Sequence, residues 1–485
     1  MQAKAIKTIT RASLTQMTEI DRVDLFRALL RQDLSSFIQR AFRTVDPGAP
    51  YQHGWHVDAI ARQLERIASG DIRRLIITMP PRSMKSIAAS VAFPAYLLGH
   101  DPSQQIVAVS YSDVLAEKLA LDCLKVIEAP WYRSTFPATR LAKGRTRRVD
   151  FATTRGGGRF STSIGGTLTG RGGNIILIDD PHKPEDATSE VKRKAVLEWF
   201  KSTLLSRQND PATSAIVLIQ QRVHEEDLAG TLIESGGWVH LDLPAIAEDH
   251  QVIDLGRRGK FIREPGHLLH PSRLSHAVLD ERKAELGSYL FAAQYQQRPA
   301  PLGGGLIKWD WFKNYSAQPA PASGDRIIQS WDTASKADEA NDWSVCTTWR
   351  VRGRHAWLLD VHRDRLEFPE LRRRIPALAD QWQAKLILLE EAGSGIQLLQ
   401  DLRQSGGYSV RGLLPKDDKA TRLLAVSHVI EGGQIAVPRD APWLAEFQRE
   451  VSLFPNGKYD DQVDSLSQFL RWFSEPRLTP RIRAL

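Results

Sequence analysis

The first residues that could do chemistry lie in the stretch RLIITMPPRSMKSIAAS, residues 74–90. An apolar, strand-like run precedes Lys85 and Ser86, which open an Ala-rich segment typical of a helix. A loop at a helix start can bind phosphate through free backbone N–H groups, with the lysine reaching the β- and γ-phosphates and the serine binding Mg²⁺. Met79 and Met84 occupy the places of the two usual loop glycines. The loop alone therefore fits a nucleotide site and an ordinary strand–turn–helix junction equally well.

Two carboxylates at the end of a second apolar run favour the nucleotide site. The run NIILIDDPHK, residues 174–183, contains Asp179 and Asp180 directly after its apolar part. Carboxylates at the end of a buried strand are unfavourable unless they are paired or bound to metal. We expect Asp179 to hold the Mg²⁺ shell and Asp180 to polarise the attacking water. The predicted ATP-binding set comprises Arg82, Ser83, Met84, Lys85, Ser86, Asp179 and Gln221.

A third polar group ends the run SAIVLIQQR. Gln220, Gln221 and Arg222 would lie at the same sheet edge, where they could sense the γ-phosphate and transmit its loss. This pattern is less specific than the pair of carboxylates.

A second set of acids is spread over the C-terminal half. Asp332 ends one strand-like run, Glu390 ends another, and Asp460, Asp461 and Asp464 open the helix-like segment DDQVDSLSQFLRWF. Three such elements can converge on two divalent metal ions about 4 Å apart, which stabilise the attacking and leaving oxygens at a phosphodiester. In the alternative interpretation, the aspartates cap the helix and the acids at the strand ends are solvated. Capping explains one carboxylate well, but not three acidic positions in this order.

Composition bounds the class of protein. The chain has 485 residues, of which 42% are hydrophobic and 25% charged, as in ordinary soluble globular proteins. Its net charge of +8 permits a polyanionic partner. We expect no membrane span, because no run of about 18 apolar residues is present, and no signal peptide. With Cys123 and Cys346 as the only cysteines, far apart, we expect a reducing cytosol without disulfides.

The elements that must position these residues alternate along the chain. Continuous apolar runs separated by helix-like segments predict a parallel sheet covered on both faces; the runs are 74–79, 105–111, 174–179, 214–222 and 238–245. A stretch rich in Pro, Gly and Ala, residues 298–324, is predicted to be a linker. A smaller mixed α/β domain is predicted beyond it. The predicted divisions are 1–50, an N-terminal helical arm; 51–297; 298–324; 325–472; and 473–485, a basic tail.

Taken in order, these motifs resemble the large terminase subunit of tailed bacteriophages over about residues 50 to 470. The matching segments are PPRSMKS, SYS, GGTLTGRGGNIILIDDP, IQQRVHEEDLAG, FAAQYQQRPAPLGGG, SWDTA, EEAGSG and DDQVDSLS. The resemblance implies an α/β protein with an N-terminal P-loop (ASCE-type) ATPase domain at 51–297 and a C-terminal ribonuclease H-like nuclease domain at 325–472. It also implies DNA packaging, in which ATP hydrolysis drives double-stranded DNA into a procapsid and a two-metal endonuclease cuts concatemeric DNA at initiation and termination.

The resemblance assigns roles to residues. The implied catalytic residues are Asp180, Asp332, Glu390, Asp461 and Asp464, and the implied metal ligands are Ser86, Asp332, Glu390, Asp460, Asp461 and Asp464. The match leaves open which of the last three aspartates binds metal. The family often has Asp-Glu where this chain has Asp179-Asp180. The implied catalytic base is therefore an aspartate rather than a glutamate, which bears on its strength as a base.

Cofactors and partners are implied in the same way. The cofactors are ATP and Mg²⁺, with Mn²⁺ as an alternative at the nuclease site. The partners are double-stranded DNA, the small terminase subunit and the portal protein, with a homo-oligomeric ring (a pentamer) when docked, a monomer in solution, and no membrane. The location is the host cytoplasm, transiently at the procapsid portal vertex.

Basic residues complete the expectations. In ring motors a neighbouring subunit often supplies an arginine to the ATP site, and the candidates are Arg147, Arg148 and Arg171, with Arg159 less favoured. DNA phosphates would be held by Lys336, Lys416 and Lys419.

Three rival interpretations remain open. A helicase-like translocase–nuclease would need a second RecA-like domain, for which residues 225–300 are too short. A DNA-binding scaffold or a transposase-like integrase would not need Lys85 together with Asp179 and Asp180. A prophage remnant with inactive chemistry is the third.

Overall fold

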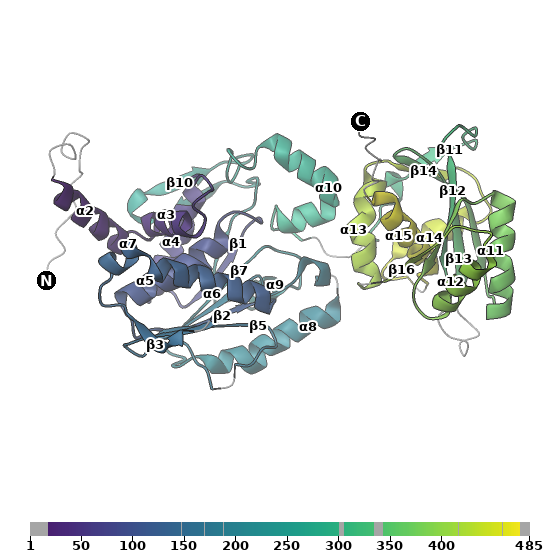
Figure 1. Ribbon diagram of the computed structural model, residues 1–485. Helices are drawn as coiled ribbons and strands as arrows, with labels where there is room; N and C mark the ends of the chain where they lie inside the picture. Colours follow the sequence, from purple (N-terminus) through teal and green to yellow (C-terminus); the bar gives the residue numbers. More distant parts are fainter. Residues whose placement is uncertain are drawn as a thin grey trace, which may run out of the picture. The chain divides into compact units, whose positions relative to one another are not determined.

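The computed structural model describes residues 18–146, 148–168, 170–187, 189–299, 305–333, 343–415, 417–457 and 459–475 (Figure 1). The chain divides into two compact units. One comprises residues 1–184, 191–279 and 292–299, and the other 185–190, 280–291 and 300–485. In the part of the chain that the structure describes, no helix is long and apolar enough to cross a membrane.

The first unit is built on an eight-stranded sheet, counted over the described residues, with the order β3-β4-β5-β2-β6-β7-β1-β8. From β5 to β8 every neighbouring pair is parallel, whereas β3 and β4 add an antiparallel edge. The strands are β1 Arg74–Thr78, β2 Gln105–Ser110, β3 Leu141–Thr146, β4 Asp150–Thr153, β5 Gly158–Ser163, β6 Ile175–Asp179, β7 Ala215–Gln220 and β8 Val239–Asp242. A separate hairpin pairs β9 Gln251–Asp254 with β10 Lys260–Arg263.

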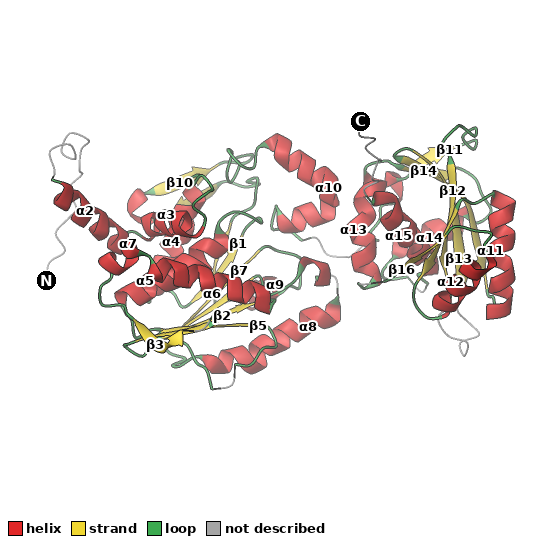
Figure 2. Ribbon diagram, viewed as in Figure 1, coloured by secondary structure: helices red, strands yellow, loops and turns green. Residues whose placement is uncertain are grey.

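Helices cover both faces of this sheet (Figure 2). Alternate strand residues separate the two layers: Leu75 and Ile77 pack in the core with α3, α4, α5 and α6, whereas Ile76 packs in the core with α8 and α9. The helices are α2 Glu19–Gln32, α3 Leu34–Val45, α4 Trp55–Ala68, η1 Ile87–Ala92, α5 Phe93–His100, α6 Asp113–Glu128, α7 Pro130–Thr135, α8 Glu190–Trp199, η3 Phe200–Leu204 and α9 Leu228–Ser235. Residues 280–291 of a further helix, α10 His276–Gln294, belong to the second unit. Short 3-10 turns lie at η2 Pro184–Asp186, η4 Leu205–Arg207 and η5 Gly256–Arg258.

The N-terminal segment differs from the predicted arm. Leu34, Phe37 and Ile38 of α3 are fully buried, so this helix is part of the core of the first unit. Its amphipathic pattern predicts the helix correctly, but the surface that buries its apolar face comes from residues distant in the sequence. Residues 1–17 lie outside the described part of the chain.

The second unit contains a seven-stranded sheet over its described residues, with the order β11-β17-β14-β13-β12-β15-β16. The central strands β12, β13 and β14 are antiparallel, and the outer pairs are parallel. The strands are β11 Lys313–Tyr315, β12 Arg326–Asp332, β13 Ser344–Arg352, β14 His355–Asp364, β15 Leu386–Glu390, β16 Val410–Leu413 and β17 Ile435–Pro438. The helices are η6 Trp309–Trp311, α11 Phe368–Trp382, α12 Ser394–Ser405, α13 Lys419–Glu431, α14 Leu444–Leu453 and α15 Asp461–Ser474.

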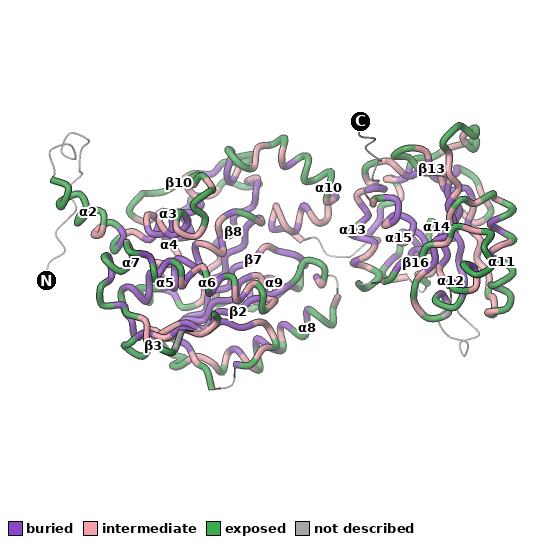
Figure 3. The backbone as a smooth tube through the Cα atoms, viewed as in Figure 1, coloured by how far each residue is buried: buried purple, intermediate pink, exposed green. Residues whose placement is uncertain are grey.

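Two cores flank this second sheet. One joins β12, β13 and β14 to α13, α14 and α15, and the other joins the opposite sheet face to α11 and α12. Figure 3 shows the resulting contrast within the unit, with α15 buried and the outer side of α11 exposed. The predicted fold class, an α/β chain with a mainly parallel N-terminal sheet and a mixed C-terminal sheet, is confirmed.

Part of the predicted linker is ordered structure. Leu306, Ile307 and Phe312 are buried in the core of the second unit, and β11 pairs with β17. The sequence did not predict this ordered structure, because its few apolar residues stand among many prolines, glycines and alanines. The strand β11 is also only three residues long. Residues 300–304 lie outside the described part of the chain, as do residues 476–485 of the predicted basic tail.

Candidate functional sites

The loop after β1 adopts a backbone conformation that usually requires glycine. Arg82 and Met84 have φ values of 60° and 70°, in the left-handed region that non-glycine residues rarely occupy. Met84 stands where the sequence pattern places the second loop glycine. Strained backbone of this kind persists at sites where the surrounding structure imposes it. Met84 therefore adopts a backbone conformation that the glycine of the sequence pattern would favour, even though glycine is absent.

The strand ends of β1, β6 and β7 bring the predicted nucleotide-site residues together. These strands are neighbours in the parallel sheet, so their carboxyl ends share one edge. The Lys85 Nζ donates to Asp180 Oδ1 at 2.7 Å, and the Ser86 hydroxyl donates to Asp179 Oδ1 at 3.0 Å. The main-chain N–H of Gln221 also donates to Asp180 Oδ1, at 3.1 Å. Lys85 with Asp180 and Ser86 with Asp179 thus form two adjacent hydrogen-bonded pairs at one sheet edge.

The charges in this group shift the titration of Asp179. Burial and the neighbouring Asp180 raise the pKa of Asp179 to about 6, whereas hydrogen bonds from Ser90 and Ser86 and the charge of Lys85 oppose that rise. A carboxylate whose ionised form is disfavoured in this way gains from additional positive charge nearby. Bound Mg²⁺ would supply such charge.

A cavity of about 970 Å³ opens beside this group. The residues that line it include the loop from Arg82 to Ser86 with Asp180 and Gln221, and the apolar side chains of Phe42, Val45 and Leu119. A cavity of this size, lined by both polar and apolar groups, can hold a nucleotide.

The three residues predicted to sense the γ-phosphate have different surroundings. Gln221 lines the cavity. Gln220 is buried, and its side-chain amide has no hydrogen-bond partner among the described residues. Arg222 is committed to its own loop, because its guanidinium binds Asp227 at 3.0 Å and the carbonyls of His224 and Glu225. These contacts stabilise the loop after β7, and the predicted sensing role of Arg222 stays a prediction.

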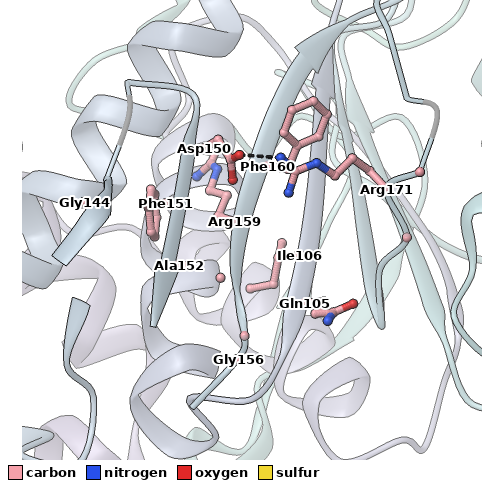
Figure 4. Close-up of a pocket in the computed structure, with 14 residues that line it drawn as sticks. Gln105, Ile106, Gly144, Asp150, Phe151, Ala152, Gly156, Arg159, Phe160 and Arg171 are labelled. Atoms are coloured by element: carbon pink, nitrogen blue, oxygen red, sulfur yellow. Dashed lines mark hydrogen bonds and ion pairs between the residues drawn. The ribbon is translucent and has the colours of Figure 1, made fainter. Parts of the chain in front are cut away.

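The arginines predicted to act at the ATP site of a neighbouring subunit differ in their contacts and exposure. Arg171 forms an ion pair with Asp150 at 2.5 Å beside a cavity of about 540 Å³ (Figure 4), and Arg148 forms one with Glu117 at 2.8 Å. Both side chains keep substantial exposure. Arg159 is 1% exposed, which is incompatible with service to a neighbouring subunit. Arg147 lies outside the described part of the chain.

The second unit brings the C-terminal acids together at the ends of β12 and β15 and the start of α15. Asp332 is the last residue of β12, Glu390 the last of β15, and Asp461 and Asp464 lie in the first turn of α15. Ser465 fastens α15 to the sheet, since its hydroxyl donates to the Ser330 carbonyl at 2.8 Å. This hydrogen bond holds the start of α15 beside the end of β12.

Burial and mutual repulsion shift the titration of these acids. Burial, together with the charges of Asp464, Glu390 and Asp461, raises the pKa of Asp332 well above its ordinary value. Burial and the charges of Glu450 and Asp460 raise the pKa of Asp461 to about 6. Among the described residues, the Asp332 carboxylate has no hydrogen-bond or ion-pair partner. The site thus contains more negative charge than its surroundings neutralise.

Two basic side chains of α13 occupy part of this acidic group. Lys419 lies 2.7 Å from Asp460 and 2.6 Å from Asp464. Arg422, one turn later, bridges Glu390 at 3.1 Å and Asp464 at 2.7 Å. Over the residues that the structure describes, no three Asp, Glu, His or Cys side chains converge closely enough to hold a metal ion as they stand. The predicted metal ligands are therefore gathered but partly neutralised by side-chain cations.

Lys419 was predicted to contact DNA, and its ammonium instead contacts these acids. Lys336 and Lys416 lie outside the described residues.

Known proteins similar to this chain are phage terminases. Residues 329–471 match the family described as the terminase RNaseH-like domain. Two solved structures of the large terminase from a thermophilic bacteriophage, one of them in complex with ADP, are similar to the chain at 10% sequence identity, with TM-scores of 0.50 and 0.51. The matches cover 84% and 85% of this chain and 98% of each phage terminase chain.

These likenesses show that the chain has the two-domain fold of a phage large terminase, so the predicted resemblance is confirmed. No protein of curated function matches the chain significantly.

Reasoning from sequence missed Arg422 at this acidic site, and it assigned Lys419 to DNA rather than to the acids that it contacts. One signal was present, because Lys419 is the first residue of α13, where the helix dipole disfavours a positive charge. Such a lysine needs a nearby acid. The partner acids lie 41 or more residues away in the sequence, so spacing alone could not identify them.

Because Arg422 bridges two acids, we expect its replacement to lower the stability of the folded protein. Replacing Arg422 with glutamine leaves Glu390 and Asp464 without their shared cation and should lower the unfolding free energy of the metal-free protein by about 2 kcal/mol or more. Arg411→Gln is the matched control, since Arg411 makes a two-point ion pair with the half-exposed Glu475 and should change stability by less than about 1 kcal/mol. Equal effects of the two substitutions in denaturant unfolding with EDTA would contradict the assigned bridge.

Proposed function

We propose that the chain is the large subunit of a DNA-packaging terminase, with ATP hydrolysis in the N-terminal unit and metal-dependent DNA cleavage in the C-terminal unit. The observation that carries the proposal is the pair of contacts Lys85–Asp180 and Ser86–Asp179 beside a nucleotide-sized cavity, in a chain whose residues 329–471 match the terminase RNaseH-like domain family. An ATPase without a nuclease, or a nuclease alone, would leave one of the two acidic centres without a use.

In the ATPase unit, the roles follow from the contacts. Lys85 would leave Asp180 and bind the nucleotide phosphates, which releases Asp180 to orient the attacking water. Asp179 and Ser86 would hold Mg²⁺. Main-chain N–H groups of the loop from Arg82 to Ser86 would bind the phosphates, as in phosphate loops.

The role of Asp180 gives a testable difference between binding and turnover. Asp180→Asn should keep nucleotide affinity within a few-fold and lower ATP turnover by ~10²-fold or more, because the amide cannot accept a proton. Nucleotide binding by calorimetry and phosphate release measure the two quantities. Asp122→Asn is a suitable control, since Asp122 lines the same cavity but is paired with Lys118. Turnover near that of the wild type would assign the water-orienting role to another residue.

In the nuclease unit, the donor set fits divalent cations. Asp332 lacks a partner among the described residues and has a raised pKa, and carboxylate oxygens are the ligands that Mg²⁺ and Mn²⁺ prefer. Asp332, Glu390, Asp461 and Asp464 would hold the ions, with Asp460 at the exposed edge. Bound divalent ions would supply positive charge to the oxygens of a phosphodiester. Lys419 and Arg422 would then be free to contact the DNA backbone, which makes DNA binding sensitive to salt.

The biological setting is part of the same proposal. The partners would be double-stranded DNA, a small terminase subunit and a portal protein, with a ring of copies assembled on the procapsid in the host cytoplasm. ADP is bound in one of the two similar phage terminase structures, which supports a nucleotide ligand here.

The proposal is tested by ATP turnover with and without linear double-stranded DNA, run beside Mn²⁺-dependent cleavage of plasmid DNA. We expect hydrolysis that DNA stimulates and cleavage that EDTA prevents. A folded protein that shows neither activity would instead support the inactive prophage remnant.

A further inference from the structure

Ser90 contacts the nucleotide-site carboxylate in a way that the proposed ATPase does not yet use. Its hydroxyl donates to Asp179 Oδ2 at 2.6 Å, while Ser86 donates to the other oxygen, Oδ1, at 3.0 Å. Both oxygens of Asp179 are therefore held by hydroxyls on one helical segment, four residues apart. Because the expected role of Ser86 is to bind Mg²⁺, Ser90 is the donor that remains to Asp179 when the site is loaded.

The backbone that carries Ser90 is unusual. Residues Ile87–Ala92 form η1, a π-helical turn directly after the phosphate loop, before the chain continues into α5. Such widened turns are rare in regular helices and occur frequently at functional sites. A widened turn changes the direction of each side chain along the helix, and here the one hydroxyl on it meets the buried carboxylate.

Arg159 of β5 holds this turn from the side. Its guanidinium donates to the Ser90 carbonyl through Nη1 and to the Ser161 hydroxyl through Nε, the latter at 3.0 Å. Ser90 and Arg159 are each 1% exposed. Figure 4 shows Arg159 on the strand next to Ile106 of β2, its register partner.

The burial of Arg159 has an energetic consequence. The guanidinium forms no ion pair with an acid among the described residues, and a buried charge without an acid partner opposes folding. Its hydrogen bond to the Ser90 carbonyl is the contact that links it to the nucleotide site. A costly buried arginine at this place is explained if the position of Ser90 matters to the chemistry.

We propose that Ser90, fixed by Arg159, is a positioning residue that orients Asp179 for Mg²⁺ and so sets the Mg²⁺ dependence of nucleotide binding. This inference rests on the proposed ATPase function. Without the Ser90 hydroxyl, Oδ2 loses its donor and the carboxylate can rotate within its pocket. Nucleotide binding without Mg²⁺ depends on Lys85 and the loop N–H groups and does not require Ser90.

The test compares binding of a fluorescent ADP analogue to the full chain with MgCl₂ and with EDTA. The strengthening of binding by Mg²⁺ should be about tenfold smaller in Ser90→Ala than in the wild type, the size expected for one hydrogen bond to a charged group. Binding in EDTA should be unchanged. Ser90→Thr, which keeps the hydroxyl, should restore the Mg²⁺ effect.

Ser35→Ala is the matched control. Ser35 is also a buried serine that donates to a buried aspartate, Asp58, at 2.5 Å, but Asp58 is paired with Arg258 outside the nucleotide site. This variant should retain the full Mg²⁺ effect. A full Mg²⁺ effect in Ser90→Ala, or an equal loss of binding in EDTA, would overturn the inference and leave Ser90 with a purely structural role. If the wild type binds no nucleotide under either condition, the proposed ATPase function fails and the inference with it.

Discussion

Lys85→Ala is expected to lower ATP hydrolysis by at least ~10²-fold while DNA cleavage stays near the wild-type rate. Loss of one preorganised cationic donor at a reacting group has an effect of this size. Lys85 is 6% exposed, and its ammonium is the basic group bound to Asp180. Its removal also takes away a charge that opposes the raised pKa of Asp179. Phosphate release with saturating DNA measures the ATPase, and plasmid nicking in Mn²⁺ measures the nuclease.

Lys201→Ala serves as the control for Lys85→Ala, because Lys201 is an exposed lysine of η3 in the same unit. It removes the same charge from the chain without touching the cavity. ATP hydrolysis that survives in a folded Lys85→Ala protein would exclude the loop after β1 as the phosphate site.

The second large effect concerns the nuclease. Asp332→Asn should reduce Mg²⁺- or Mn²⁺-dependent cleavage by ~10²-fold or more, because the amide removes a full negative charge from the centre of the acidic group. ATP hydrolysis should be preserved, since the phosphate loop belongs to the other unit. Asp440→Asn, an exposed acid after β17, should leave cleavage unchanged.

Asp332→Asn should also stabilise the metal-free protein at neutral pH. The pKa of Asp332 is raised in the folded state, so the ionised carboxylate opposes folding at pH values above its folded pKa. Stability of the wild type in EDTA should therefore rise as the pH falls through that folded pKa toward about 4, the ordinary value. The asparagine variant should lack this part of the pH dependence in thermal unfolding. A variant less stable than the wild type at pH 7 would contradict the assigned environment.

The sequence predicted the elements whose apolar pattern is continuous. The five runs that include 74–79 and 174–179 became neighbouring strands β1, β2, β6, β7 and β8, because uninterrupted apolar strands must be covered on both faces. Strands β3, β4 and β5 were not predicted. Their segment is short, polar and broken by glycines at 156–158, so pairing with β2, rather than local pattern, determines them.

The sequence predicted those candidate-site residues that lie at the ends of strands. Asp179, Asp332 and Glu390 end strands, and parallel neighbours bring such ends together. The positive φ of Met84 could not be predicted, since methionine gives no sign of a left-handed conformation. Ser90 and Arg422 were missed because their partners are fixed by tertiary packing, 89 and 42 residues away in the sequence.

The central claim is that one chain carries two chemically separate centres. The most direct test measures ATP hydrolysis and Mn²⁺-dependent DNA cleavage on the same preparations of Lys85→Ala and Asp332→Asn. The account predicts a crossed pattern, in which the first variant cleaves DNA without hydrolysing ATP and the second hydrolyses ATP without cleaving DNA. Loss of both activities in either folded variant would contradict it.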